Sequence, residues 1–170
     1  MPKKSDVRRV DVFAHLNDEQ ASGLMALGER QVVEAGTLLG HADAPPTTFY
    51  VILSGQAELS YGAQMPGTQM GETQVDDTGA GEIAVRLAGP GESFPWAAMR
   101  GSGNLVTNCR ARTDMEVVAI PIDALTAYCH ANAEVGMGFY RGVMDQFAGQ
   151  YGRTLAMLAA NVEQELTGIQ

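Results

Sequence analysis

Residues 89–120 read GPGESFPWAAMRGSGNLVTNCRARTDMEVVAI, and the rest of the chain is arranged around them. Strand-like residues lie on both sides of the loop part of this stretch, at 83–87 and at 116–120. Between them come a turn rich in Gly and Pro, a short apolar run at 94–99 and a Gly-Ser-Gly loop. A strand, a tight turn, one helical turn and a return strand can together hold an anion. Backbone N–H groups point into such a turn, and a helix N-terminus adds a partial positive charge.

The composition bounds the size and the class of the protein. The 170 residues suffice for one domain with its own core and an appended helix, which we expect here. Hydrophobic content of 45% and charged content of 18% are those of a soluble globular protein. The net charge of −9 argues against nucleic-acid binding, which needs clustered Lys and Arg. The only basic cluster is Lys3, Lys4, Arg8 and Arg9, which we interpret as a solvated tail.

Other function classes find no support in the sequence. No apolar run approaches the roughly 18 residues of a membrane span, so no membrane association is expected. The N-terminus lacks the apolar core of a signal peptide, which predicts a cytoplasmic protein. In that compartment Cys109 and Cys129 are expected to be free thiols. The spacing of His15, His41 and His130 matches no metal motif, so no metal and no cofactor are expected.

The N-terminal part predicts a short helix followed by short strands. Asn17 can cap a helix whose apolar stripe is Leu16, Leu24 and Leu27 and which ends at Gly28. The run at 49–59, FYVILSGQAEL, is the strongest strand signal, interrupted by a Gly suited to a bulge or a tight bend. Short strands punctuated by glycines predict a mainly β fold with helices, a β-barrel or jelly roll rather than a βαβ fold.

Residues 62–81 form a long stretch without periodicity. These 20 residues contain five glycines, one proline and the acidic pair Asp76-Asp77. A loop of this length in a compact domain is either functional or disordered. We interpret it as a mobile hairpin extension, with a partner-binding arm as the alternative.

The C-terminal part predicts two helices. The first follows Pro121, is capped by Asp123 and runs to about His130. The second runs from about 134 to 164 and carries a coiled-coil seam. Because many glycines would weaken this helix, we expect them beside the seam, where they allow another helix to approach closely. The N-terminal half is expected to pack on the chain's own barrel and the C-terminal half on a second copy. The seam consists of Met144, Phe147, Tyr151, Leu155, Leu158 and Val162.

Taken in order, these features resemble the cyclic-nucleotide-binding domain of the catabolite-activator/Fnr family over residues 11 to about 165. The resemblance implies a jelly-roll β-barrel, also called a double-stranded β-helix, at 11–132 and a long dimerisation helix at 133–166. It also identifies the stretch after Gly89 as a phosphate-binding cassette. The similarity lies in the pieces FAHL at 13–16, VEAG at 33–36, FYVILSG at 49–55, GPGESF at 89–94 and CRARTDMEV at 109–117.

The residues that the family uses for its ligand are replaced. The resemblance implies a Gly-Glu pair, whose Glu accepts the ribose hydroxyl, and a later Arg-Thr-Ala or Arg-Ser-Ala, whose Arg pairs with the phosphate. Pro95-Trp96 stands at the first position and Leu105-Val106-Thr107 at the second. A buried phosphate without a counter-charge is strongly penalised, so we expect no binding of cyclic AMP or cyclic GMP. The candidate ligand-pocket residues are Phe94, Trp96, Ala97, Met99, Arg100, Ser102, Leu105 and Thr107.

Three alternatives stay open at the cassette. Arg100, beside the glycine loop, could serve an anion nest or be an exposed side chain, which we favour. Arg110 and Arg112 are expected to be solvent-facing residues of the return strand. Trp96 could line an apolar pocket or plug it, and we favour plugging or core packing over stacking on a ligand.

The sequence predicts a binding module rather than an enzyme. No serine or cysteine lies in a nucleophile motif, no carboxylate pair has a recognisable spacing, and a cupin-like enzyme would need metal ligands. The family's winged helix would follow the long helix, where this sequence ends, so we expect the sensor module alone. We predict a cytoplasmic homodimer that binds a small molecule or a partner protein in or near a degenerate cassette. The alternative is a ligand-free protein–protein interaction module.

Overall fold

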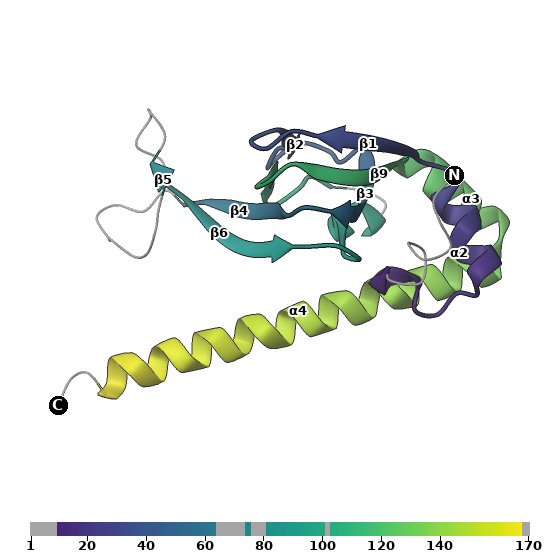
Figure 1. Cartoon of the computed structure of the whole chain (residues 1–170). Helices are drawn as coiled ribbons and strands as arrows, with labels where there is room; N and C mark the ends of the chain where they lie inside the picture. The colour runs from purple at the N-terminus through teal and green to yellow at the C-terminus, as the bar shows by residue number, and fades with distance from the viewer. Residues whose placement is uncertain (1–9, 64–73, 76–80, 101–102, 168–170) are drawn as a thin grey trace.

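A computed structural model describes residues 10–63, 74–75, 81–100 and 103–167 (Figure 1). For residues 63, 74–75, 81–83, 100 and 161–167 the description is limited to the backbone. The elements are η1 (Asp11–Phe13), α2 (Asp18–Met25), β1 (Glu29–Val33), β2 (Leu38–Gly40), β3 (Thr48–Ser54), β4 (Ala57–Ala63), β5 (Gln74–Val75), β6 (Gly81–Ala88), β7 (Ser93–Phe94), η2 (Trp96–Arg100), β8 (Asn108–Ala111), β9 (Met115–Pro121), α3 (Ile122–Ala131) and α4 (Ala133–Thr167).

The strands form two antiparallel sheets that face each other, as predicted for a jelly roll. The described strands are ordered β1-β9-β3-β7 in one sheet and β2-β8-β4-β6-β5 in the other. Strand neighbours are far apart in sequence, as in the pairing of β3 with β9, where Phe49 lies opposite Ile120. This arrangement brings the two ends of the cassette, β7 and β8, into different sheets on either side of the barrel interior.

The apolar residues form two core clusters. One lies between the two sheets and includes Ile52, Phe94, Cys109 and Val117. The other joins the sheet of β3 and β9 to the helices and includes Phe49 and residues of η1, α2, α3 and the first turns of α4. The molecule is therefore a β-barrel with a helical layer at one end, as Figure 1 shows.

The predicted N-cap of α2 is confirmed, and the predicted N-cap of α3 is wrong. Asn17 caps α2 in a reciprocal capping box with Gln20, as its position ahead of acidic residues indicated. Asp123, by contrast, is not the cap of α3. That helix begins at Ile122 behind Pro121, and no side chain caps it. Proline fits there because its fixed φ suits a helix start, and Asp123 lies in the first turn, where a carboxylate complements the helix dipole.

The predicted long strand at 49–59 is two strands joined by a tight turn. Gly55 lies at the turn with φ of +82°, and a Cβ there would approach the Asp114 carbonyl oxygen to 2.2 Å. β4 then pairs with β6 as far as Ala63 opposite Gly81, and β5 adds two residues to the same sheet. The stretch at 62–81 thus contributes its described residues, 62–63, 74–75 and 81, to the strands of this sheet. Its predicted mobility concerns residues 64–73 and 76–80, which lie outside the described residues.

The first half of α4, taken as the turns up to Val143, packs against its own chain, and the helix beyond Val143 is called its second half. Val135, Phe139 and Val143 are buried, and Phe139 lies edge-on to Phe49 with 5.7 Å between ring centroids. The second half leaves the helical layer as a single extended helix (Figure 1). Every residue from 151 to 160 is exposed, and the described seam side chains are 48–62% exposed. The Val162 side chain lies outside the description.

Three of the α4 glycines, Gly136, Gly138 and Gly142, face backbone of their own chain instead of a second helix, whereas Gly149 and Gly152 do not test the expectation. A Cβ on Gly136 would lie 2.7 Å from the Cys129 carbonyl oxygen, and one on Gly138 would lie 2.9 Å from the His15 carbonyl oxygen. At Gly142 the corresponding distance to the Val12 carbonyl oxygen would be 2.1 Å. These glycines let the helix approach the backbone of η1 and α3, which a side chain would prevent.

Candidate functional site

The cassette begins with a buried phenylalanine between the sheets. Gly91, with φ of +90°, makes the turn that precedes β7, and its N–H and carbonyl both bond to neighbouring backbone. Phe94 at the end of β7 is fully buried and stacks on Tyr50, with ring centroids 5.3 Å apart. The predicted single helical turn is present as η2, which starts at Trp96. Phe94 therefore serves as one wall of the barrel interior.

Trp96 is held in place by two neighbours. Its indole Nε1 donates a hydrogen bond of 3.2 Å to the Ser93 hydroxyl. The guanidinium carbon of Arg86 lies 4.0 Å from the centre of the indole ring, a cation–π contact. The half-buried ring packs against the helix-side core cluster. Trp96 therefore packs against the core of its own chain.

Arg86 is the residue at this site that the sequence reasoning missed. Its side chain is only 7% exposed, and its terminal nitrogen lies 2.8 Å from a Glu92 carboxylate oxygen. The other Glu92 oxygen accepts a 2.7 Å bond from the Gly89 N–H. The Arg86 Nε is buried and has no hydrogen-bond partner in the described structure. The cation beside the cassette is therefore already paired within the protein.

A second carboxylate lies near this ion pair. The backbone N–H of Asp11 donates to the Gly91 carbonyl oxygen at 3.0 Å, which places η1 beside the cassette turn. Desolvation raises the pKa of Asp11, the Glu92 carboxylate raises it further, and Arg86 and Arg153 oppose the rise. Arg153 comes from α4, so the long helix contributes charge to this corner of the barrel.

Leu105 is buried at 4% exposure. Its N–H donates to the Ala44 carbonyl and its carbonyl accepts from the Asp43 N–H, each at 2.9 Å. This pair of bonds ties the end of the cassette to the loop between β2 and β3. An apolar side chain at this position can neutralise no phosphate. Thr107, two residues later, is half-buried and bonds the thiol of Cys109.

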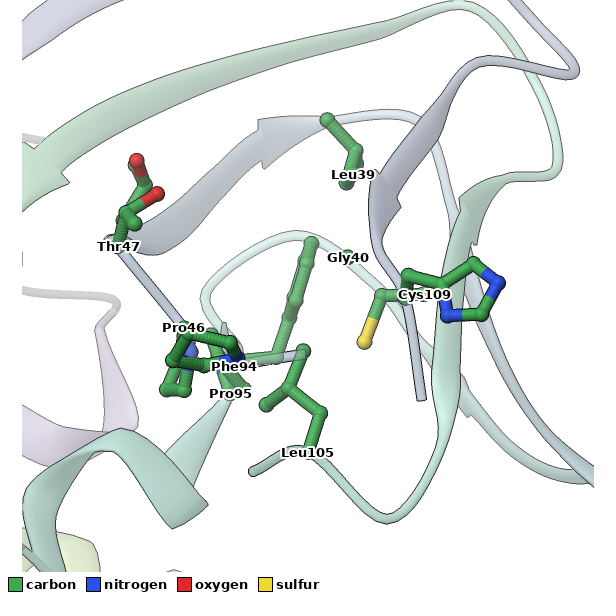
Figure 2. Close-up of a pocket in the computed structure, with 11 residues that line it drawn as sticks. Leu39, Gly40, Pro46, Thr47, Phe94, Pro95, Leu105 and Cys109 are labelled. Atoms are coloured by element: carbon green, nitrogen blue, oxygen red, sulfur yellow. The ribbon is translucent and has the colours of Figure 1, made fainter. Parts of the chain in front are cut away.

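A small pocket of about 110 Å³ lies between the two ends of the cassette (Figure 2). Its described lining consists of residues 39–41, 45–48, 94–95, 105 and 109. Phe94 and Leu105, two of the predicted pocket residues, lie in its wall. The sulfur of Cys109 points toward them in Figure 2. Burial raises the pKa of this thiol to about 11.

The other predicted pocket residues lie elsewhere. Trp96, Ala97, Met99 and Thr107 do not line the pocket. Met99 packs against the helix-side core because η2 turns that way. The side chain of Arg100 and all of Ser102 lie outside the described residues, so the structure says nothing of their role.

Arg110 and Arg112 are exposed, as predicted, and neither lines the pocket. Arg110 donates to the Gly36 carbonyl at 2.8 Å, and Arg112 pairs with Glu58 at 2.9 Å. Arg112 lies just beyond β8 instead of on it, a small correction to the predicted strand.

The described residues contain neither a candidate metal site nor a candidate membrane-spanning helix. No three His, Cys, Asp or Glu side chains of the described chain are grouped so that they could hold a metal ion. None of the described helices combines the length and the apolarity that crossing a bilayer requires.

Comparison with solved structures relates the fold to known regulators. The N-terminal domain of a transcriptional regulator from Streptomyces coelicolor matches at 22% identity with a TM-score of 0.63, covering 84% of this chain and 92% of that one. A cyclic nucleotide-binding domain from Methylobacillus flagellatus matches at 13% identity with a TM-score of 0.67, covering 91% and 85%. The catabolite activator protein of Thermus thermophilus matches at 18% identity with a TM-score of 0.65, covering 88% of this chain.

These similarities establish the fold, and the sequence itself establishes the family. This chain spans 63% of the Thermus protein. A search of curated proteins found no match. The model of the cyclic nucleotide-binding domain matches residues 30–132, more than half of the 170 residues. Since that match covers the barrel and the whole cassette, the chain belongs to the cyclic nucleotide-binding domain family.

Proposed function

We propose that this chain is a non-enzymatic regulatory module that does not recognise cyclic nucleotides through the contacts typical of its family. The observation that carries the proposal is the pair Trp96 and Leu105, which occupy the positions of the ribose-binding Glu and the phosphate-binding Arg. Neither side chain offers an acceptor for the ribose or a charge for the phosphate.

The geometry gives a second reason to doubt nucleotide binding. Ligand pockets for drug-sized molecules span about 300–1,000 Å³. The pocket at the cassette holds about 110 Å³. The buried cation closest to it in the barrel, Arg86, is neutralised by Glu92. A nucleotide phosphate would have to break that pair and compete with two nearby carboxylates, those of Glu92 and Asp11.

Isothermal titration calorimetry tests this proposal directly. Cyclic AMP and cyclic GMP, titrated into the protein at micromolar concentrations, should give no saturable heat. The control is the double variant Trp96→Phe, Arg86→Lys, which keeps an aromatic ring and a cation and should behave in the same way. Saturable micromolar binding to the wild type would refute the proposal, and its loss in Arg100→Gln would identify Arg100 as the substitute cation.

The non-enzymatic role is supported by the protonation state of the two cysteine thiols. Burial raises the pKa of Cys109 to about 11 and also raises that of Cys129. Both thiols are therefore protonated near neutral pH, which makes them poor nucleophiles. We include no cofactor in the proposal.

We further propose that the module works as a homodimer and binds no nucleic acid. The exposed seam of α4 supports the dimer, because each such side chain contributes roughly 1.5–3 kcal/mol when it is fully buried. The charge of −9 supports the absence of DNA binding. A duplex DNA mobility-shift assay at physiological salt should show no shift; a salt-sensitive shift would contradict this part and would point to the basic residues at 3–9.

A ligand-free interaction module is the second candidate. It is favoured by the same exposed seam, which offers a surface for a partner protein, and by the packed state of Trp96. The two candidates differ in whether the pocket between Phe94 and Leu105 is ever occupied.

A further inference from the structure

The pocket beside the cassette has a size and a lining that define a class of ligand. A cavity of about 150 Å³ lined by aliphatic and aromatic side chains can hold one benzene molecule. The pocket here, at about 110 Å³, is of that order. It is several times smaller than a nucleotide site, so its occupant has about the size of a single ring.

The lining of the pocket carries no fixed charge among the described residues. Leu39, Phe94, Leu105 and three prolines supply apolar walls. Thr47, Thr48 and His41 add polar residues to the lining, and the Nδ1 atom of His41 is in hydrogen-bond contact with the Ala42 carbonyl oxygen. Since no Lys, Arg, Asp or Glu is among the described lining residues, a charged ligand would lose its hydration without gaining a partner.

The walls are already in place without a ligand. The backbone of Leu105 is bonded to Asp43 and Ala44, as described above, and the Ala42 N–H donates to the Asn108 side chain at 2.8 Å. Phe94 is held from behind by Tyr50. A preformed pocket saves the ordering cost of binding, which matters most for a ligand with few atoms.

We propose that this pocket binds a small uncharged molecule of single-ring size, with an apolar body and one hydrogen-bonding group. This inference rests on the proposed function, since it supplies the ligand class of a module whose nucleotide contacts are replaced. The apolar body lies between Phe94 and Leu105, and the polar group faces the part of the wall formed by Thr47 and Thr48.

Phenol and benzoate form a matched pair of probes, because they share a ring and differ in charge. Phenol titrated into the full chain should shift the amide NMR signals of Leu39, Gly40, Leu105 and Cys109 saturably, with a Kd of about 1 mM, as suits so few atoms. Benzoate should bind at least tenfold more weakly. Equal binding of both probes, or phenol shifts confined to the exposed seam of α4, would overturn the proposal.

Two variants fill the pocket and one serves as a control. A Cβ at Gly40 would lie 2.8 Å from the Leu105 Cδ1, so Gly40→Ala pushes Leu105 into the pocket and should weaken phenol binding at least tenfold. Cys109→Leu fills the pocket from another strand and covers the case in which Gly40→Ala does not fold. Gly62→Ala, where a Cβ meets nothing within 4 Å, should leave binding unchanged. Unchanged phenol binding in a folded pocket-filling variant would refute the site.

The outcomes separate this inference from the proposed function. If neither phenol nor a cyclic nucleotide binds, only the ligand class is wrong. If cyclic AMP binds at micromolar concentration, the replacement of the nucleotide contacts is wrong, whatever phenol does.

Discussion

The two halves of α4 belong to one continuous helix of 35 residues and have opposite surroundings. The first half is built from glycines and buried apolar residues that fit against η1 and α3. The second half has large apolar residues on one stripe, and all its described side chains from 151 to 160 are exposed. A helix of this length is therefore stabilised by its own domain over one part only. The other part needs a different source of stability, because helix propensity alone rarely holds a segment.

The comparison shows that the structural role of a glycine or of an apolar residue depends on the half of α4 in which it occurs. In the first half, small residues allow contact between backbones, and Phe139 fills the space between Phe13 and Phe49. In the second half, a Cβ on Gly152 would meet nothing within 4 Å, and Phe147 is 57% exposed. Matched substitutions in the two halves should therefore differ in kind as well as in size.

The largest difference is expected for the two phenylalanines. Phe139→Ala removes a fully buried ring and should lower the free energy of unfolding by about 3–5 kcal/mol, independent of protein concentration. Phe147→Ala should shift the balance between dimer and monomer and leave the protomer core intact. Chemical denaturation at two protein concentrations distinguishes them. Equal, concentration-independent losses would mean that both halves pack internally.

A smaller contrast is expected for two glycines. Gly142→Ala would place a Cβ 2.1 Å from the Val12 carbonyl oxygen and should cost about 1–3 kcal/mol even after the gain in helix propensity. Gly152→Ala should stabilise the helix by up to about 1 kcal/mol. Thermal unfolding monitored by circular dichroism measures both. A destabilising Gly152→Ala would indicate that a partner helix approaches closely at that position.

The smallest effect is electrostatic and tests whether the second half stays near the barrel. Because the folded state raises the pKa of Asp11, folding favours its protonated form. The stability that the protonated Asp11 contributes is fully present below the unfolded pKa of 3.8. It is lost as the pH rises through the pKa of Asp11 in the folded state. Asp11→Asn should thus raise stability near pH 7 by no more than about 0.5 kcal/mol and leave it unchanged near pH 3.

The same carboxylate reports on Arg153. Arg153→Gln removes a charge that lowers the pKa of Asp11, so an NMR titration of Asp11 should give a higher pKa in the variant. An unchanged titration would show that the second half of α4 does not stay beside η1 in solution.

The sequence predicted those parts of the molecule that depend on local patterns. The N-cap at Asn17, the break in the strand at Gly55 and the stripe of α4 are all set by residues a few positions apart. The cassette was located correctly because its turn and its apolar run are contiguous. The prediction that Asp123 caps α3 was wrong because Asp and Pro are both common at a helix start. Only the backbone shows that Pro121 lies at the N-cap and Asp123 in the first turn.

Arg86 and the second wall of the pocket could not be predicted from local patterns. In β6 the apolar residues Val85 and Leu87 alternate with Arg86. Alternation alone would place Val85 and Leu87 in the barrel interior and Arg86 in solvent. The structure leaves Val85 and Leu87 about half exposed and buries Arg86, beside an irregularity in the pairing with β4. The pocket wall at 39–48 is joined to Leu105 by long-range backbone bonds, for which the sequence holds no signal.

The number of copies in solution tests the central claim, that the second half of α4 is the interface of a two-copy regulatory module. Light scattering at micromolar concentration should give about twice the chain mass of 18.0 kDa. The variant Leu155→Asp, Leu158→Asp should fall to the mass of one chain while it keeps the near-UV circular dichroism of the barrel. A wild-type mass of one chain, with the seam still exposed to solvent, would contradict the account.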